Sequence, residues 1–171
     1  LGIGQAKQLI LDSPFAYAEQ SLLCVPRGLP DTGFARRATE LAQLLTPVIN
    51  KVPGGVFFLC TSYQSMRQIA EVLRRDVGRL VLLQGEDNKQ RLLSQFVDNG
   101  RAILVATASF WEGVDVRGAA LSCVIIDKLP FTAPDEPLLK ARMEDCRLQG
   151  GDPFTQLQLP DAVITLKQGV G

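Results

Sequence analysis

Residues 101–115 read Arg-Ala-Ile-Leu-Val-Ala-Thr-Ala-Ser-Phe-Trp-Glu-Gly-Val-Asp, and this stretch decides the predicted fold. An apolar run over residues 102–106 ends at Thr107, and a short polar loop follows it. Such runs are typical of parallel strands, whose two faces are both covered by helices. Open α/β sheets bind ligands just beyond the carboxyl ends of their strands. The loop is therefore either part of a ligand site or an ordinary turn; it supplies two carboxylates and a glycine, at Glu112, Gly113 and Asp115.

Apolar runs alternate with helical patterns along the chain, which predicts an α/β fold with a mainly parallel sheet flanked by helices. We expect strands at residues 21–25, 56–60, 80–83, 102–107 and 121–126. We expect helices that begin near residues 36, 61, 87 and 134. Residues 152–160 are expected to form a loop, and residues 162–166 a short strand or the start of a helix. One domain over residues 1–171 accounts for all of these elements.

The composition is that of a globular protein, because 46% of the 171 residues are hydrophobic and only 21% are charged. Eighteen basic residues balance eighteen acidic ones, so bulk positive charge is not what would bind a nucleic acid. No apolar stretch reaches the roughly 18 to 20 residues of a membrane span, and no amino-terminal signal pattern is present. We therefore expect a cytoplasmic protein that does not bind membranes.

The chain lacks the residues of several common sites. It contains no histidine, which removes the usual general base of Ser-His-Asp and Cys-His enzymes. Its four cysteines are too widely spaced for zinc or iron–sulfur ligation, so we expect no metal site, and we expect Cys60 and Cys123 to be buried thiols. No Gly-x-x-x-x-Gly-Lys-Ser/Thr loop occurs, and Gly2-Ile3-Gly4 lacks the third glycine of a dinucleotide fingerprint. This chain alone therefore cannot hold a triphosphate in the usual way.

Polar residues follow three of the expected strands, as Thr61-Ser62, Gln84-Gly85 and Thr107. Hydroxyl groups and the N–H groups of helix amino termini attract phosphate, so several such sites along one edge could contact a nucleic-acid backbone without a large net charge. The alternative is simple helix capping, since Thr61 with Gln64 and Asp87 with Gln90 have the spacing of a capping box.

The chain resembles the second motor domain of superfamily 2 helicases. The motifs that carry this resemblance are, in order, Cys60-Thr61-Ser62, Gln84-Gly85 with Arg91 and Phe96, Ile103-Leu104-Val105-Ala106-Thr107, Gly113-Val114-Asp115 and Gln168-Gly169-Val170-Gly171. Further segments resemble the DinG branch of the XPD-like DNA helicases, namely Ser13-Pro14-Phe15, Phe110-Trp111-Glu112-Gly113-Val114-Asp115, Asp127-Lys128-Leu129-Pro130-Phe131 and Leu159-Pro160-Asp161-Ala162. The resemblance covers roughly residues 13 to 171.

This resemblance implies a RecA-like domain, the carboxyl-terminal one of two motors, with a P-loop NTPase type of fold but no phosphate loop of its own. ATP would lie in the cleft between the motors, and single-stranded or forked DNA would run across both. The implied DNA-binding residues are Thr61, Ser62, Gln84 and Thr107. The implied nucleotide-binding residues are Glu112, Gly113, Asp115, Gln168, Gly169 and Gly171. No residue of this chain is implied to be catalytic.

The resemblance also implies partners outside this chain. The first motor of the same polypeptide would carry the phosphate loop, the Mg²⁺ ligand and, where the family has one, an iron–sulfur cluster. The chain would end within the sixth helicase motif, before the arginines that stabilise the transferred phosphoryl group. We therefore expect ATP-dependent unwinding in the 5′ to 3′ direction from the full-length helicase, with replication or repair proteins as possible partners, and no ATP hydrolysis by this chain alone.

Two other functions are compatible with the residues. The neutral charge and the missing phosphate loop fit a non-catalytic α/β protein-interaction module, which would expose an apolar patch away from the strand ends. A small transferase of the Rossmann type is the second alternative, and the missing glycine fingerprint and histidine weaken it.

Overall fold

In a computed structural model of the chain, the residues described are 9, 16–27, 29, 34–107, 110, 114, 116, 118–132 and 135–170. The chain divides into two units, Leu1–Pro30 and Asp31–Gly171. In the first unit, a short helix, α1 (Tyr17–Gln20), ends where the Ser21 hydroxyl and N–H both donate to the Tyr17 carbonyl. The predicted strand at residues 21–25 is wrong, because these residues pair with no neighbouring strand and Leu22 and Leu23 are exposed.

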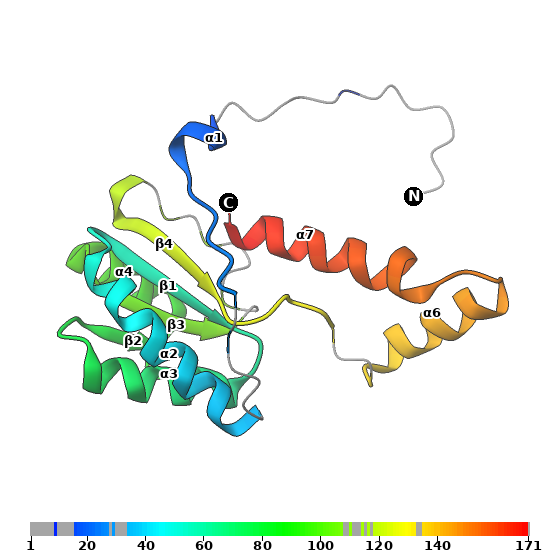
Figure 1. The fold of residues 1–171 in the computed structure, drawn as a ribbon, viewed down its shortest axis with the longest axis horizontal. Helices are drawn as coiled ribbons and strands as arrows, with labels where there is room; N and C mark the ends of the chain where they lie inside the picture. The colour runs from blue at the N-terminus through cyan, green and yellow to red at the C-terminus, as the bar shows by residue number, and fades with distance from the viewer. Residues whose placement is uncertain are drawn as a thin grey trace. The chain divides into compact units, whose positions relative to one another are not determined.

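The second unit contains a sheet of four parallel strands in the order β2-β3-β1-β4 (Figure 1). The strands are β1 (Gly55–Cys60), β2 (Val81–Leu83), β3 (Ile103–Thr107) and β4 (Leu121–Ile126). Four of the five predicted strands are thus confirmed to within one residue at each end. The two central strands, β1 and β3, are buried along their whole length, which is why their sequences are apolar without alternation.

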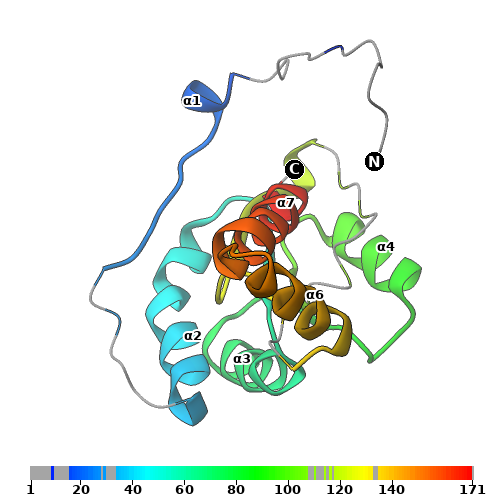
Figure 2. The ribbon, with the colours of Figure 1, turned by 90° about the vertical axis from the view of Figure 1, so that its right-hand side faces the viewer.

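Helices cover both faces of this sheet, and the predicted α/β fold is confirmed. Figure 2 shows α2 and α3 on one side and α4 on the other. Phe57 and Leu59 of β1 share a buried cluster with Phe96 of α4. Side chains of a strand alternate between its faces, so Phe58 lies on the side of α3. The bounds of the three helices are Phe34–Lys51 for α2, Tyr63–Asp76 for α3 and Lys89–Asn99 for α4.

The sequence predicts a helix over residues 36–49 that Pro47 kinks or ends, whereas α2 begins at Phe34 and continues through Pro47 to Lys51. The alternative in which the helix ends at Pro47 is therefore wrong. Ala42 and Ile49, on either side of Pro47, are fully buried, so packing of this face holds the chain helical across a residue that lacks an N–H. Tertiary packing therefore outweighs the local preference at this position.

The last part of the chain is helical, and two predictions for it need correction. Helix α6 (Pro137–Leu148) confirms the predicted helix with a start three residues later, whereas residues 152–160 are not a loop. They include a π-helical turn, η2 (Phe154–Gln158), which begins where the Asp152 carboxylate accepts the N–H groups of Phe154 and Thr155 at 3.3 and 3.2 Å. Of the two alternatives for residues 162–166 the helix is correct, because they lie in α7 (Leu159–Val170).

A single guanidinium group joins several segments at the amino edge of the sheet, where the strands begin. Arg79 Nε donates to the Arg101 carbonyl at 2.6 Å, and Nη1 donates to the Ile49 carbonyl at 2.7 Å. The same side chain donates to the carbonyls of Val52 and Gly54. Ile49 lies in the last turn of α2 and Val52 directly follows the helix, where helix carbonyls lack intrahelical partners. Arg79 thus ties the end of α2 to the starts of β1 and β3.

Close packing at the same edge requires a glycine at the first position of β1. A Cβ atom on Gly55 would overlap the Ala120 carbonyl oxygen and the ring of Phe96. Ala120 ends the short 3₁₀ helix η1 (Gly118–Ala120) that leads into β4. The absence of a side chain at Gly55 therefore lets β4 and α4 approach β1 closely.

Several further predictions concern burial and membrane or metal binding. Cys60 is buried as predicted, whereas Cys123 is only half-buried because β4 is an edge strand. None of the helices within the described ranges combines the length and the apolar character that crossing a bilayer requires. Over those same ranges, no group of three or more His, Cys, Asp and Glu side chains is arranged to hold a metal ion.

Candidate functional site

The carboxyl ends of the four parallel strands lie along one edge of the sheet and carry polar residues. In the order of the strands, this edge runs from Gln84 after β2, through Thr107 and Thr61, to Asp127 after β4. We call these four residues the carboxyl-edge set. Three of them were predicted from the sequence to lie at such an edge, and the strand order confirms that placement.

The β2–β3 half of this edge is formed by Gln84 and Thr107. The Thr107 N–H donates to Gln84 Oε1 at 2.7 Å, and the Thr107 hydroxyl donates to the same oxygen at 3.0 Å. The Gln84 N–H donates to the Val105 carbonyl at 3.0 Å, which extends the ladder beyond β2. Only 7% of Thr107 is exposed, whereas Gln84 is half-buried. The amide is therefore the more accessible group of this pair.

The β1–β4 half is formed by Thr61 and Asp127. The Thr61 N–H donates to Asp127 Oδ1 at 3.0 Å, and the Thr61 hydroxyl lies 3.5 Å from Oδ2. Burial raises the pKa of the Asp127 carboxyl above its usual value, while Lys128 and the N–H of Thr61 oppose that shift. Burial also raises the pKa of the Cys60 thiol, and the nearby Asp127 adds to this, so Cys60 stays protonated at neutral pH.

A small hollow beside Asp127 adds positive charge to this half of the edge. Its lining includes Arg37 of α2, Ser65 of α3 and Lys128, which follows β4. The hollow is therefore lined by two cationic side chains and a hydroxyl beside the Asp127 carboxylate. Arg37 is not among the predicted DNA-binding residues, because adjacent arginines on helices are mostly solvated.

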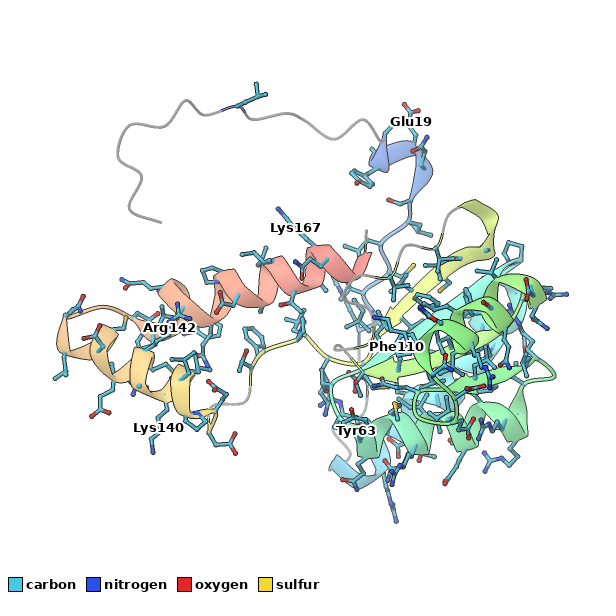
Figure 3. All side chains as sticks on the ribbon, turned by 180° about the vertical axis from the view of Figure 1, so that it is seen from behind. Glu19, Tyr63, Phe110, Lys140, Arg142 and Lys167 are labelled. Carbon is cyan, nitrogen blue, oxygen red and sulfur yellow. The ribbon has the colours of Figure 1, made fainter. Side chains whose placement is uncertain are left out.

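The start of α3 corrects one prediction and adds a residue that we had not predicted. Ser62, not Thr61, is the N-cap, since its hydroxyl accepts the Ser65 N–H at 3.2 Å while Asp127 holds Thr61. Likewise, Asn88 rather than Asp87 caps α4. Tyr63, the first residue of α3, is 59% exposed, and Figure 3 shows it at the end of the domain toward which the strands run.

Comparison with known proteins identifies the type of domain. Residues 45–171 match the family described as the Helicase C-terminal domain. The chain belongs to this helicase family.

Individual relatives agree with this assignment. Over 171 residues the chain is 64% identical to "ATP-dependent DNA helicase YoaA" of Escherichia coli (strain K12). The aligned region is 100% of this chain and 27% of that relative. It is 36% identical over 168 residues to "ATP-dependent helicase DinG" of Mycobacterium tuberculosis (strain ATCC 25618 / H37Rv), and the aligned region is 95% of this chain and 25% of that relative. It is 32% identical over 169 residues to "3'-5' exonuclease DinG" of Bacillus subtilis (strain 168), and the aligned region is 94% of this chain and 18% of that relative. The chain thus spans about a quarter or less of the length of these relatives.

The predicted nucleotide-binding residues of this helicase domain are only partly described. Gln168 is exposed and Gly169 is half-buried in the last turn of α7. Glu112, Gly113, Asp115 and Gly171 lie outside the described residues, as does Trp111. Phe110, three residues after β3, is buried in the cluster shared with α4, and Lys89 Nζ lies 5.3 Å from its ring centre. Phe110 is therefore anchored in the core, and the assigned nucleotide contacts stay predictions.

Two residues of this edge are not among the assigned DNA-binding or nucleotide-binding residues. For Asp127 the sequence holds a signal, because Asp127 and Lys128 end a strand on the ligand side, which is compatible equally with a role in the cleft and with local pairing. Tyr63 carries no comparable signal, because the sequence does not show whether an aromatic residue in the first turn of a helix is buried or exposed.

Proposed function

We propose that this chain is the second motor domain of an ATP-dependent DNA helicase, and that the carboxyl-edge set forms half of its single-stranded DNA track. The observation that carries the proposal is the alignment of hydroxyl, amide and N–H groups along one edge, in a chain that belongs to a helicase domain family. The names of the YoaA and DinG relatives support ATP-dependent DNA unwinding as the activity. We propose the 5′ to 3′ direction and a role in repair or replication, with repair or replication proteins as partners.

The chemistry of the edge suits a motor that must bind DNA and then release it. Dense lysine patches hold phosphates strongly and in a salt-dependent way, because binding releases condensed counterions. Neutral groups such as the Thr61 hydroxyl and the Gln84 amide make weaker contacts with phosphate that are easily exchanged. Two cations, Arg37 and Lys128, line a hollow at one end of the edge.

We also propose that the loop after β3 couples the two ligands. Thr107 belongs to the carboxyl-edge set that would form the DNA track, and Gly113, six residues later, would approach ATP, so each ligand would influence the same loop. Glu112, Asp115, Gln168, Gly169 and Gly171 would complete this half of the nucleotide site. The first motor would supply the phosphate loop, the Mg²⁺ ligands and any iron–sulfur cluster, so this chain alone would not hydrolyse ATP.

The test uses the full-length protein. We expect single-stranded DNA to stimulate its ATP hydrolysis, and we expect it to displace a strand from forked DNA with a 5′ tail rather than a 3′ tail. Thr107→Ala should lower the DNA-stimulated rate, since this residue begins the coupling loop. A protein whose ATP hydrolysis does not respond to DNA would contradict the proposed function, and normal stimulation in Thr107→Ala would contradict the coupling alone.

One observation favours a second function, that of a protein-interaction module. Several apolar side chains of the carboxyl-terminal helices are exposed, namely Leu138, Leu148, Phe154, Val163 and Ile164. In a helicase, such side chains would contact other parts of the same polypeptide. An interaction module would instead lose a separate partner protein when Leu148, which is 82% exposed, is changed to Lys, and it would show no DNA-stimulated ATP hydrolysis.

A further inference from the structure

The contact with Thr107 fixes the orientation of the Gln84 amide. Both the N–H and the hydroxyl of Thr107 donate to Gln84 Oε1, at 2.7 and 3.0 Å. A backbone N–H can only donate, so the Gln84 atom that faces it must be the oxygen and not the nitrogen. The Nε2 group, with its two N–H donors, therefore points away from Thr107.

This orientation decides which of the two side chains can serve a phosphate. Phosphate oxygens accept hydrogen bonds, so the protein must provide the donor. The hydroxyl hydrogen of Thr107 is directed at Gln84, and only 7% of Thr107 is exposed. Gln84 is half-buried at the tip of β2, and the following residue, Gly85, turns the chain with a φ of 97°. Gln84 is thus the residue of this pair whose side-chain N–H groups can donate to a ligand at the edge.

We propose that Gln84 Nε2, rather than the Thr107 hydroxyl, donates to a phosphate of the bound DNA strand. Thr107 is then a positioning residue, because its two donors hold the amide oxygen and aim the amide nitrogen. The inference rests on the proposed function, since it names the donor within the same DNA track. It reverses the roles that the sequence suggests, in which the Thr107 hydroxyl contacts the phosphate directly.

The first experiment replaces the donors of Gln84 and keeps its acceptor. In Gln84→Glu, a carboxylate oxygen still accepts from the N–H and hydroxyl of Thr107, so the melting temperature should match that of the wild type. Both N–H donors are lost, and the affinity of the full-length protein for labelled single-stranded DNA should fall about tenfold. The new charge also repels phosphate, but added salt screens that repulsion and leaves the loss of the donor. A loss that disappears at high salt would contradict the proposal.

The second experiment changes the positioning residue. Thr107→Val removes the hydroxyl and keeps the N–H that holds Gln84, so we expect affinity for the same DNA to fall only about two- to threefold. Thr107→Ser keeps the hydroxyl and should restore wild-type affinity. Equal losses in Thr107→Val and Gln84→Glu would contradict the proposal, because they would point to the Thr107 hydroxyl as the phosphate contact. Wild-type affinity in Gln84→Glu would also contradict it, because the amide would then donate to no phosphate. A wild-type protein that does not bind single-stranded DNA would instead overturn the proposed function together with this inference.

Discussion

The two edges of the sheet are held together by different kinds of hydrogen bond. At the amino edge, the Arg79 guanidinium donates to four backbone carbonyls, those of Ile49, Val52, Gly54 and Arg101. At the carboxyl edge, backbone N–H groups and hydroxyls donate to side chains, the carboxylate of Asp127 and the amide of Gln84. The first arrangement joins main chain through a group that is always charged. The second joins main chain to side chains that keep further hydrogen-bonding capacity.

Because of this difference, we expect substitutions at the amino edge to change the stability of the fold and substitutions at the carboxyl edge to change ligand binding. Carbonyls at the amino edge have their partner within the fold, so changes there should act on the free energy of unfolding. The Gln84 amide and the Asp127 carboxylate each use part of their capacity inside the fold, so changes there should act on ligands more than on stability. Each of the following predictions tests one side of this comparison.

The largest effect is expected at Arg79. Arg79→Met removes the donors of four carbonyls, and we expect the free energy of unfolding to fall by about 3 kcal/mol, measured by urea denaturation. Arg75→Met is the matched control, because Arg75 pairs only with the neighbouring Asp76 on the surface, and it should cost less than about 1 kcal/mol. Equal losses in the two variants would remove the distinction between Arg79 and an ordinary surface arginine.

Gly55→Ala should have the next largest effect. The new methyl group would overlap the Ala120 carbonyl oxygen and the buried ring of Phe96, so we expect a loss of about 2 kcal/mol in the free energy of unfolding. Gly78→Ala provides the control, since a Cβ there would meet no atom within 4 Å, and it should be neutral or slightly stabilising. A Gly55→Ala protein as stable as the wild type would mean that β4 does not approach β1 as closely as described.

At the carboxyl edge, Tyr63→Ala should leave stability nearly unchanged and weaken DNA binding. Its ring is 59% exposed, and stacking of a base on an aromatic ring contributes roughly 1 to 3 kcal/mol, so we expect about a tenfold loss of affinity for single-stranded DNA. Fluorescence anisotropy with the full-length protein measures this directly. Tyr63→Phe keeps the ring and should bind like the wild type; if it binds as weakly as Tyr63→Ala, the ring does not stack on a base.

The smallest effect is expected for Asp127→Asn. Burial raises the pKa of this carboxyl in the folded protein, so its contribution to stability is fully present below its ordinary pKa and is lost as the pH rises through the raised value. The asparagine keeps an acceptor for the Thr61 N–H but does not titrate. At neutral pH the variant should therefore equal or exceed the wild type by less than about 1 kcal/mol, because the group is partly solvated.

Urea denaturation between about pH 4 and pH 8 measures this difference, with the wild type expected to gain relative to Asp127→Asn as the pH falls. The opposite trend would mean that Lys128 and Thr61 stabilise the charged carboxylate more than burial destabilises it. The pKa of Asp127 would then be lowered rather than raised.

Local features of the sequence were sufficient to predict most of the fold. Apolar runs identified β1 and β3 closely, because a strand that is covered on both faces needs apolar side chains at every position. The errors lie where packing or pairing overrides local preference. Pro47 remains inside α2 because Ala42 and Ile49 on the same helix are buried, and residues 21–25 are exposed and belong to no strand of the described sheet.

The sequence by itself determined that polar residues follow buried parallel strands, and therefore that Thr61, Gln84 and Thr107 lie at one edge. Only the tertiary structure decided which of these residues meet. Thr61 and Asp127 are 66 residues apart in the chain, and Gln84 and Thr107 are 23 apart, so each pair depends on the strand order β2-β3-β1-β4. That order follows from how the helices and strands pack together, which no local pattern of residues records. For this reason the orientation of the Gln84 amide, and with it the proposed phosphate donor, emerges only from the folded chain.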